Sequence, residues 1–154
     1  LQRYVVKFTV SMQGRSVTAG VPATMSGTAG TYTEESIEAA LNNLVFTGVK
    51  PGEYLFTTLQ PGYLNVHAGL VKTLTVNGDL EIEALQLIGG NAVWADNVID
   101  VLDAVLIGQW YFIGDITNDA DVNFDNKVNI FDLTMVGRNF DNTSADVYGE
   151  WLTP

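Results

Sequence analysis

The first half of the chain alternates polar and apolar positions with the period of a β-strand. Residues 3–12 alternate in this way and are rich in Val, Tyr and Phe, as in a half-buried strand. Shorter apolar segments follow, separated by turns that contain Pro-Gly or Asn-Gly, at residues 16–25, 44–46, 53–59, 63–67, 70–76 and 80–88. The last two flank Asn77-Gly78 and are predicted to form a closing hairpin. The pattern predicts an all-β sandwich over residues 1–88.

Two segments have helical spacing instead. Helical spacing would place four apolar residues on one face, Ile37, Ala40, Leu41 and Leu44, so a short helix is allowed near residues 34–42. In the second half, apolar residues recur with helical spacing between residues 130 and 140, at Phe131, Leu133, Met135, Val136 and Phe140. This spacing predicts a helix that begins directly after a polar segment.

That polar segment, residues 121–132, carries oxygen-bearing side chains at its first, third, fifth, ninth and twelfth places. They are Asp121, Asn123, Asp125, Asn129 and Asp132. Calcium takes about six to eight oxygen ligands, and this spacing lets a tight loop wrap the ion, with the backbone carbonyl of the seventh residue, Lys127, as a further ligand. No amphipathic helix precedes the loop, and its last ligand is Asp where an EF-hand has Glu. The alternative is an Asp- and Asn-rich surface turn without an ion.

The same pattern occurs once more, 29 residues upstream. Residues 96–103 align with residues 125–132, and the register continues as far as Tyr111 and Phe140. Ala92 and Trp94 stand at the first and third places of this copy, and neither side chain can bind calcium. The ligands that remain are Asp96, the carbonyl of Val98, Asp100 and Asp103. Either a distorted calcium site persists there, or the carboxylates repel one another and turn to solvent.

Charge separates the two halves of the chain. The net charge is −11. Residues 1–89 hold five Lys and Arg against seven Asp and Glu, whereas residues 90–154 hold two against eleven. The change falls at Gly89-Gly90, so we expect one domain over residues 1–88 and another over residues 89–154. Such acidity fits cation binding and disfavours nucleic acid or an anionic membrane surface as a partner.

Residue types that carry catalytic chemistry are scarce. His67 is the one histidine and there is no cysteine, so no two-histidine metal site and no thiol chemistry is possible. No phosphate-binding loop or nucleophile elbow is present. We therefore expect that the chain is not an enzyme. The chain has three tryptophans, Trp94, Trp110 and Trp151. They could form a sugar-stacking platform, but packing in a small core is the favoured interpretation, and carbohydrate is not an expected ligand.

Two known families are similar to parts of this sequence. The tandem loop-then-helix segments of residues 89–141 resemble dockerins, calcium-binding modules that attach to cohesin domains. The motifs FTGVKPGEY (46–54) and QPGYL (60–64) resemble carboxypeptidase regulatory-like domains, which are transthyretin-like β-sandwiches without catalytic activity. Together these resemblances imply two modules, a transthyretin- or Ig-like sandwich followed by a small α-helical dockerin-like module. Leu1 is not an initiator methionine, so we expect a fragment of a secreted or cell-surface protein whose signal peptide is not visible.

The dockerin resemblance also implies which residues would face a cohesin-bearing partner. They lie at matching places of the two copies: Val101, Leu102 and Gln109 in the first, and Ile130, Phe131 and Arg138 in the second. An alternative is that the second half is a calcium-stabilised end-cap without a partner, and another is a carbohydrate-binding module. If the apolar pairs 101/102 and 130/131 face solvent, a protein interface is favoured. If they are buried, the end-cap is favoured.

Overall fold

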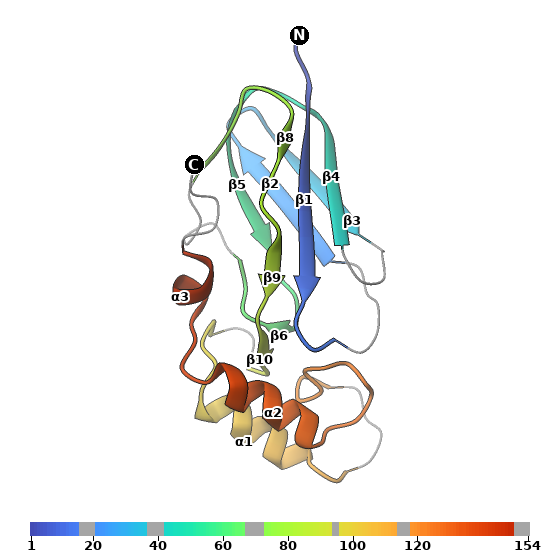
Figure 1. The fold of residues 1–154 in the computed structure, drawn as a ribbon, viewed down its shortest axis with the longest axis vertical. Coiled ribbons are helices and arrows are strands. Elements are labelled where there is room, and N and C mark those ends of the chain that lie inside the picture. Colours follow the sequence, from blue (N-terminus) through green and yellow to red (C-terminus); the bar gives the residue numbers. More distant parts are fainter. Residues whose placement is uncertain (16–20, 37–41, 67–72, 94–95, 114–117, 150–154) are drawn as a thin grey trace.

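A computed structural model describes residues 1–15, 21–36, 42–66, 73–93, 96–113 and 118–149 of the chain. In these ranges the strands precede the helices, and Figure 1 shows the two longer helices at the end of the molecule opposite the N-terminus. The elements are β1 (Tyr4–Met12), β2 (Val21–Gly27), β3 (Gly30–Ser36), β4 (Asn42–Val49), β5 (Gly52–Thr58), β6 (Gly62–Tyr63), β7 (Leu74–Val76), β8 (Leu80–Glu81), β9 (Leu85–Leu87), β10 (Gly89–Asn91), α1 (Val101–Trp110), α2 (Ile130–Asn139) and α3 (Ser144–Tyr148).

The strands form two larger sheets and one short pair. One sheet has the order β4-β1-β8, with β9 also paired to β1, and the other has the order β3-β2-β5-β7. β1 runs antiparallel to β4 and parallel to β8 and β9. The short pair, β10 with β6, lies between the sheets and the helices (Figure 1). The prediction of a β-sandwich is thus confirmed, and the chain is mostly β-structure with short helices.

Alternation along the strands explains which face is buried. On β1, Val6, Phe8 and Val10 are buried, while the residues between them are more exposed. The ring of Phe8 stacks on that of Phe56 from the opposite sheet, with centroids 4.2 Å apart and planes 15° apart. Each fully buried side chain of this size contributes about 1.5–3 kcal/mol. The sandwich core is therefore built from inward-facing residues of both sheets.

The predicted closing hairpin is wrong. β7 pairs with β5, whereas β8 and β9 pair with β1, so the two segments belong to different sheets. Asn77-Gly78 connects the sheets rather than two paired strands. The chain is held at the edge of β1 by Asp79, whose Oδ1 accepts a hydrogen bond from the backbone nitrogen of Val5 at 2.8 Å. Apolar residues on both segments face one shared core, and local alternation cannot tell this arrangement from a hairpin.

The predicted helix near residues 34–42 is also wrong where the structure describes it. Residues 34–36 continue β3, which pairs with β2, and Asn42 begins β4. Residues 37–41 lie outside the described ranges, as do His67, Trp94 and Trp151. Pairing with β2 overrides the local helical spacing, because strand formation depends on neighbours more than on intrinsic preference.

The helical end shares buried contacts with the sandwich. The side chain of Asn139 on α2 donates hydrogen bonds to the side-chain oxygen of Gln13 and to the carbonyl of Gly89. The hydroxyl of Tyr148 on α3 donates to the carbonyl of Leu64 at 2.9 Å. β10 runs across Gly89-Gly90 and pairs with β6, so a paired strand lies at the predicted junction. A separate α-helical module is not shown, and the division into residues 1–88 and 89–154 stays a prediction.

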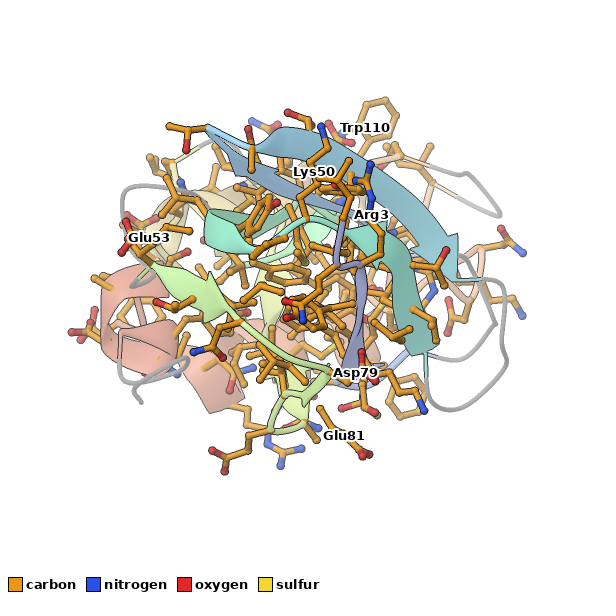
Figure 2. All side chains as sticks on the ribbon, turned by 90° about the horizontal axis from the view of Figure 1, so that it is seen from above. Arg3, Lys50, Glu53, Asp79, Glu81 and Trp110 are labelled. Carbon is orange, nitrogen blue, oxygen red and sulfur yellow. The ribbon has the colours of Figure 1, made fainter. Side chains whose placement is uncertain are left out.

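Figure 2 views the molecule from the N-terminal end, away from the helices. Arg3 and Lys50 lie near one another there. The pKa of Tyr32 is lowered by a hydrogen bond from the backbone nitrogen of Lys50, and the charges of Arg3 and Lys50 lower it further. Asp79 and Glu81 lie together on another side of this end (Figure 2). Among the described residues, no helix is long and apolar enough to cross a membrane.

Candidate metal site and exposed helix faces

The loop of residues 121–132 ends in a capping box that starts α2. The side-chain oxygen of Asn129 accepts a hydrogen bond from the backbone nitrogen of Phe131 at 2.8 Å. In return, Oδ2 of Asp132 accepts from the backbone nitrogen of Asn129 at 2.8 Å. These reciprocal bonds satisfy amide groups that the first turn of a helix leaves without partners. The ninth and twelfth places of the loop are therefore fixed by the helix.

Two buried carboxylates close the loop from its ends. Oδ1 of Asp132 also accepts from the backbone nitrogens of Val122 at 2.9 Å and Asn123 at 3.3 Å. At the other end, Asp121 accepts from the backbone nitrogens of Asp125 at 3.1 Å and Asn126 at 2.9 Å. The backbone thus curls around oxygen atoms. This is the arrangement expected of a loop that wraps a hard cation.

Left-handed residues produce the tight curvature. Asn126, at the sixth place, has φ of 67°, a conformation that Asn tolerates and that glycine usually supplies in such loops. Phe124, at the fourth place, has φ of 58°, which is uncommon for a bulky residue. Its ring stacks on Tyr63 of β6, with centroids 6.4 Å apart and planes 8° apart. Packing on the sandwich therefore helps to hold this conformation.

The electrostatics of the loop favour a cation. Burial raises the pKa of Asp121 and Asp132, backbone hydrogen bonds lower it, and the charge of Asp125 raises it further for both. An ionised carboxylate has about four acceptor positions. An ion could therefore still bind each carboxylate beside the backbone hydrogen bonds that Asp121 and Asp132 accept. The residues present fit calcium.

Carboxylates alone do not make up this site. Within the described residues, no group of three or more His, Cys, Asp and Glu side chains is gathered closely enough to hold a metal ion. The predicted ligand set is different in kind, because it also uses the amide oxygens of Asn123 and Asn129 and the backbone carbonyl of Lys127. Calcium at Asp121, Asn123, Asp125, Lys127, Asn129 and Asp132 stays a prediction.

The upstream copy repeats the hydrogen bonds of the downstream loop. Asp103 accepts from the backbone nitrogens of Val93 at 2.8 Å and Asp100 at 2.7 Å, and Asp100 accepts from that of Leu102 at 2.7 Å. Asn97 has φ of 57°, matching Asn126. α1 and α2 each have ten residues and begin 29 residues apart. The 29-residue repeat is therefore a structural repeat.

The two copies differ in their oxygen ligands. Ala92 is buried at the first place of the upstream copy, where the downstream loop has Asp121. The side-chain oxygen of Asn97 accepts from the backbone nitrogen of Asn65 at 3.3 Å, and its carbonyl accepts from that of Ser144 at 3.1 Å. Contacts within the protein thus hold the upstream loop in shape. Calcium binding by Asp96, Val98, Asp100 and Asp103 stays a prediction.

The predicted apolar pairs face solvent. Val101 is 59% and Leu102 54% exposed at the start of α1, and Ile130 is 56% and Phe131 64% exposed at the start of α2. Gln109 and Arg138 are exposed near the ends of these helices. The inward sides of the same helices carry buried residues, including Asp103, Ile107, Asp132, Met135 and Val136. The discriminating observation therefore favours an interface over internal packing, while the partner-binding role of these residues stays a prediction.

Sequence reasoning missed the residues of the sandwich that contact the downstream loop. The Arg15 guanidinium carbon lies 3.9 Å from the centroid of the Phe124 ring. A Cβ built on Gly62 would lie 3.2 Å from the Phe124 ring and 3.3 Å from the carbonyl oxygen of Val122. No local signal marks these residues, because they meet the loop only through the fold.

Comparisons with solved structures give a likeness over nearly the whole chain. A chain from a type II cohesin–X-dockerin complex of Acetivibrio cellulolyticus, an N-terminal interface mutant, matches with a TM-score of 0.70 and 16% identity over 93% of this chain and 99% of that one. A chain from a C-terminal interface mutant of this complex matches with a TM-score of 0.63 and 16% identity, over 92% and 99% of the two chains. No family model and no curated protein matches. At this identity the likeness shows the fold.

These comparisons overturn the family assignment made from the sequence. The matched structures are cohesin–X-dockerin complexes, and the described residues are mostly β-structure with small helices. A β-sandwich fold with small helices fits these findings, whereas a carboxypeptidase regulatory-like sandwich followed by a dockerin-like module does not. Pro-Gly turns and Asp-rich loops are local features, so they do not fix how strands pair along the chain. The prediction that the chain is not an enzyme agrees with the likeness.

Proposed function

We propose that the chain is a calcium-dependent protein–protein attachment module of the cohesin/dockerin type, and that it binds a cohesin-bearing partner. One observation carries this proposal: two apolar pairs, Val101-Leu102 and Ile130-Phe131, are exposed at the same place of both repeats. Exposed apolar side chains gathered on neighbouring helices are typical of a protein interface. The solved structures that share this fold come from cohesin–X-dockerin complexes, which supports a partner of that class.

Calcium would act on the interface indirectly. Asp132 is a predicted ligand and also the third residue of α2, and its Oδ2 accepts from the backbone nitrogen of Asn129. Ile130 and Phe131 lie between these two loop residues. A bound ion would thus fix the direction in which this pair points, without contact between the ion and the partner. Assemblies of this type fit a secreted or cell-surface protein.

The interface is tested with single substitutions that place a charge on each apolar pair. Leu102→Asp and Phe131→Asp are each expected to weaken binding at least tenfold, because a buried, unpaired charge typically costs several kcal/mol. Leu59→Asp is the matched control, since Leu59 is also exposed but lies after β5. Binding is measured by calorimetry against a type II cohesin and, separately, against an X-dockerin. Thermal unfolding is measured beside it.

Three results would contradict the proposal. Unchanged binding by both variants would mean that the pairs are not the interface. Loss of thermal stability in place of binding would favour the calcium-stabilised end-cap. Binding to the X-dockerin with none to the cohesin would reverse the proposed role.

Dependence on the metal is tested by thermal unfolding in calcium and in a chelator. A ligand that binds only the folded chain raises its stability by an amount that grows with concentration, about 2.7 kcal/mol at one hundred times Kd. Asp125→Ala should remove most of this gain, whereas Asp146→Ala, at an exposed position of α3, should keep it. An identical melting curve with and without chelator would show that the loop is not a calcium site.

A further inference from the structure

A turn of the sandwich brings a positive charge onto the downstream loop. Gly14, with φ of 68°, turns the chain after β1 and is followed by Arg15. The Arg15 guanidinium carbon lies 3.9 Å from the centroid of the Phe124 ring, within the range of a cation–π contact. Phe124 stands between Asn123 and Asp125, two of the predicted calcium ligands. Arg15 therefore contacts the loop at the residue between two ligand places.

Arg15 also acts electrostatically on the first ligand place. Burial lowers the pKa of the Arg15 guanidinium, whereas the charges of Tyr63 and Asp121 raise it. An arginine remains charged at any working pH. Residues 90–154 hold two Lys and Arg against eleven Asp and Glu, so the sandwich supplies a cation to a strongly acidic part of the chain.

We propose that Arg15 sets the calcium affinity of the loop, by holding it weaker than the loop's own oxygen ligands would make it. This inference rests on the proposed calcium function. The guanidinium charge stabilises the carboxylates when the ion is absent and repels the ion when it is present. The cation–π contact with Phe124 needs no metal, so it stabilises the metal-free and metal-bound chain alike and cancels from the affinity. The charge is the part that remains.

Coulomb's law gives the size of the effect. The interaction between two unit charges 4 Å apart in water changes an equilibrium constant by about tenfold or slightly less. Calcium carries two charges, and for an ion about twice as far from the guanidinium the interaction is of similar size. Removal of the Arg15 charge should therefore tighten calcium binding about three- to tenfold at low salt. Because Arg15 is only half-buried, salt should screen much of the effect, and a few tenths molar salt should reduce it to about twofold or less.

The test is calcium titration of the full chain by calorimetry, at low and high salt, with thermal unfolding in chelator. Arg15→Met removes the charge and keeps an apolar chain over Phe124. It should bind calcium three- to tenfold more tightly at low salt and melt earlier in chelator. Arg15→Lys keeps the charge, and it should bind as the unaltered chain does. Lys7→Met is the control for net charge, since Lys7 is exposed on β1, and it should not change the affinity.

Several outcomes would overturn the inference. Equal or weaker calcium binding by Arg15→Met would do so, as would equal tightening by Arg15→Lys, or a tightening that salt does not reduce. If Arg15→Met fails to fold, Arg15→Gln removes the same charge, and its affinity decides in the same way. If the unaltered chain takes up no calcium, the proposed calcium function fails as well. If the unaltered chain binds calcium and the Arg15 variants do not behave as expected, only the inference about Arg15 fails.

Discussion

Tyr148 offers a sharp test of how the last helix is joined to the sandwich. Its hydroxyl donates to the carbonyl of Leu64 at 2.9 Å and accepts from the backbone nitrogen of Ile88 at 2.9 Å. The side chain is 1% exposed. Burial raises the pKa of Tyr148, so the hydroxyl stays protonated and able to donate. Tyr148→Phe removes both hydrogen bonds and keeps the ring.

The loss follows from what the substitution leaves behind. Phenylalanine fills the same space, so the packing term is nearly unchanged. A backbone N–H and a carbonyl each lose one buried partner, and a buried group left unsatisfied costs about 1–3 kcal/mol. Leu64 and Ile88 keep one bond with each other, from the nitrogen of Leu64 to the carbonyl of Ile88 at 2.9 Å. We therefore expect a total of about 2–4 kcal/mol, or roughly 4–16 °C in Tm for a chain of this size.

The measurement is urea unfolding and calorimetry at saturating calcium. Tyr4→Phe is the matched control, because the Tyr4 hydroxyl donates to Gln2 in an exposed position, and its loss should stay within about 0.5 kcal/mol. If Tyr148→Phe lies within about 0.5 kcal/mol of Tyr4→Phe, the reasoning is refuted, and α3 is not held by this side chain.

Three further predictions follow from the loops. Calcium titration of a decalcified sample should show one site, in residues 121–132, or two sites of clearly different affinity, since affinity depends on ligand number and charge. Two sites of equal affinity would contradict the assignment of the upstream copy. Gly62→Ala should cost about 1–3 kcal/mol, because Gly62 has φ of 84° and abuts Phe124; Gly78→Ala, with open space around it, is the control, and equal urea midpoints would refute this. Asn129→Ala should cost about 1 kcal/mol by loss of the helix cap, whereas Asn129→Asp should restore most of it; an unchanged urea midpoint for Asn129→Ala would count against the cap.

Local chemistry explains what could be predicted from the sequence. The start of α2 at Ile130 and its polar cap follow from residues within one loop. The exposure of Leu102 and Phe131 follows from their places in the repeat, where each precedes a buried aspartate. The alternation of β1 predicted its buried face for the same reason. Each of these features depends on neighbours within about one turn or one strand.

What failed depends on contacts between distant segments. The segment of residues 74–87 contributes to both sheets, because one strand pairs with β5 and two pair with β1. Arg15 and Tyr63 meet the loop across more than fifty residues of chain. Spacing and composition carry no record of such pairings. The family assignment failed for the same reason, since it rested on short motifs whose arrangement in space is set elsewhere.

The position of β1 has a consequence for the order in which the chain can fold during its synthesis. β1 is made before the other strands that the structure describes, yet among these strands one of its edges pairs with β8 and β9, which begin at residue 80. Until those residues leave the ribosome, a long apolar strand has an unpaired edge, which is prone to pair with other chains. The hydroxyl that joins Leu64 and Ile88 comes from Tyr148 and arrives later still. The nascent sandwich therefore completes its buried hydrogen bonds only after Tyr148 has been made, and it depends until then on protection from neighbouring chains.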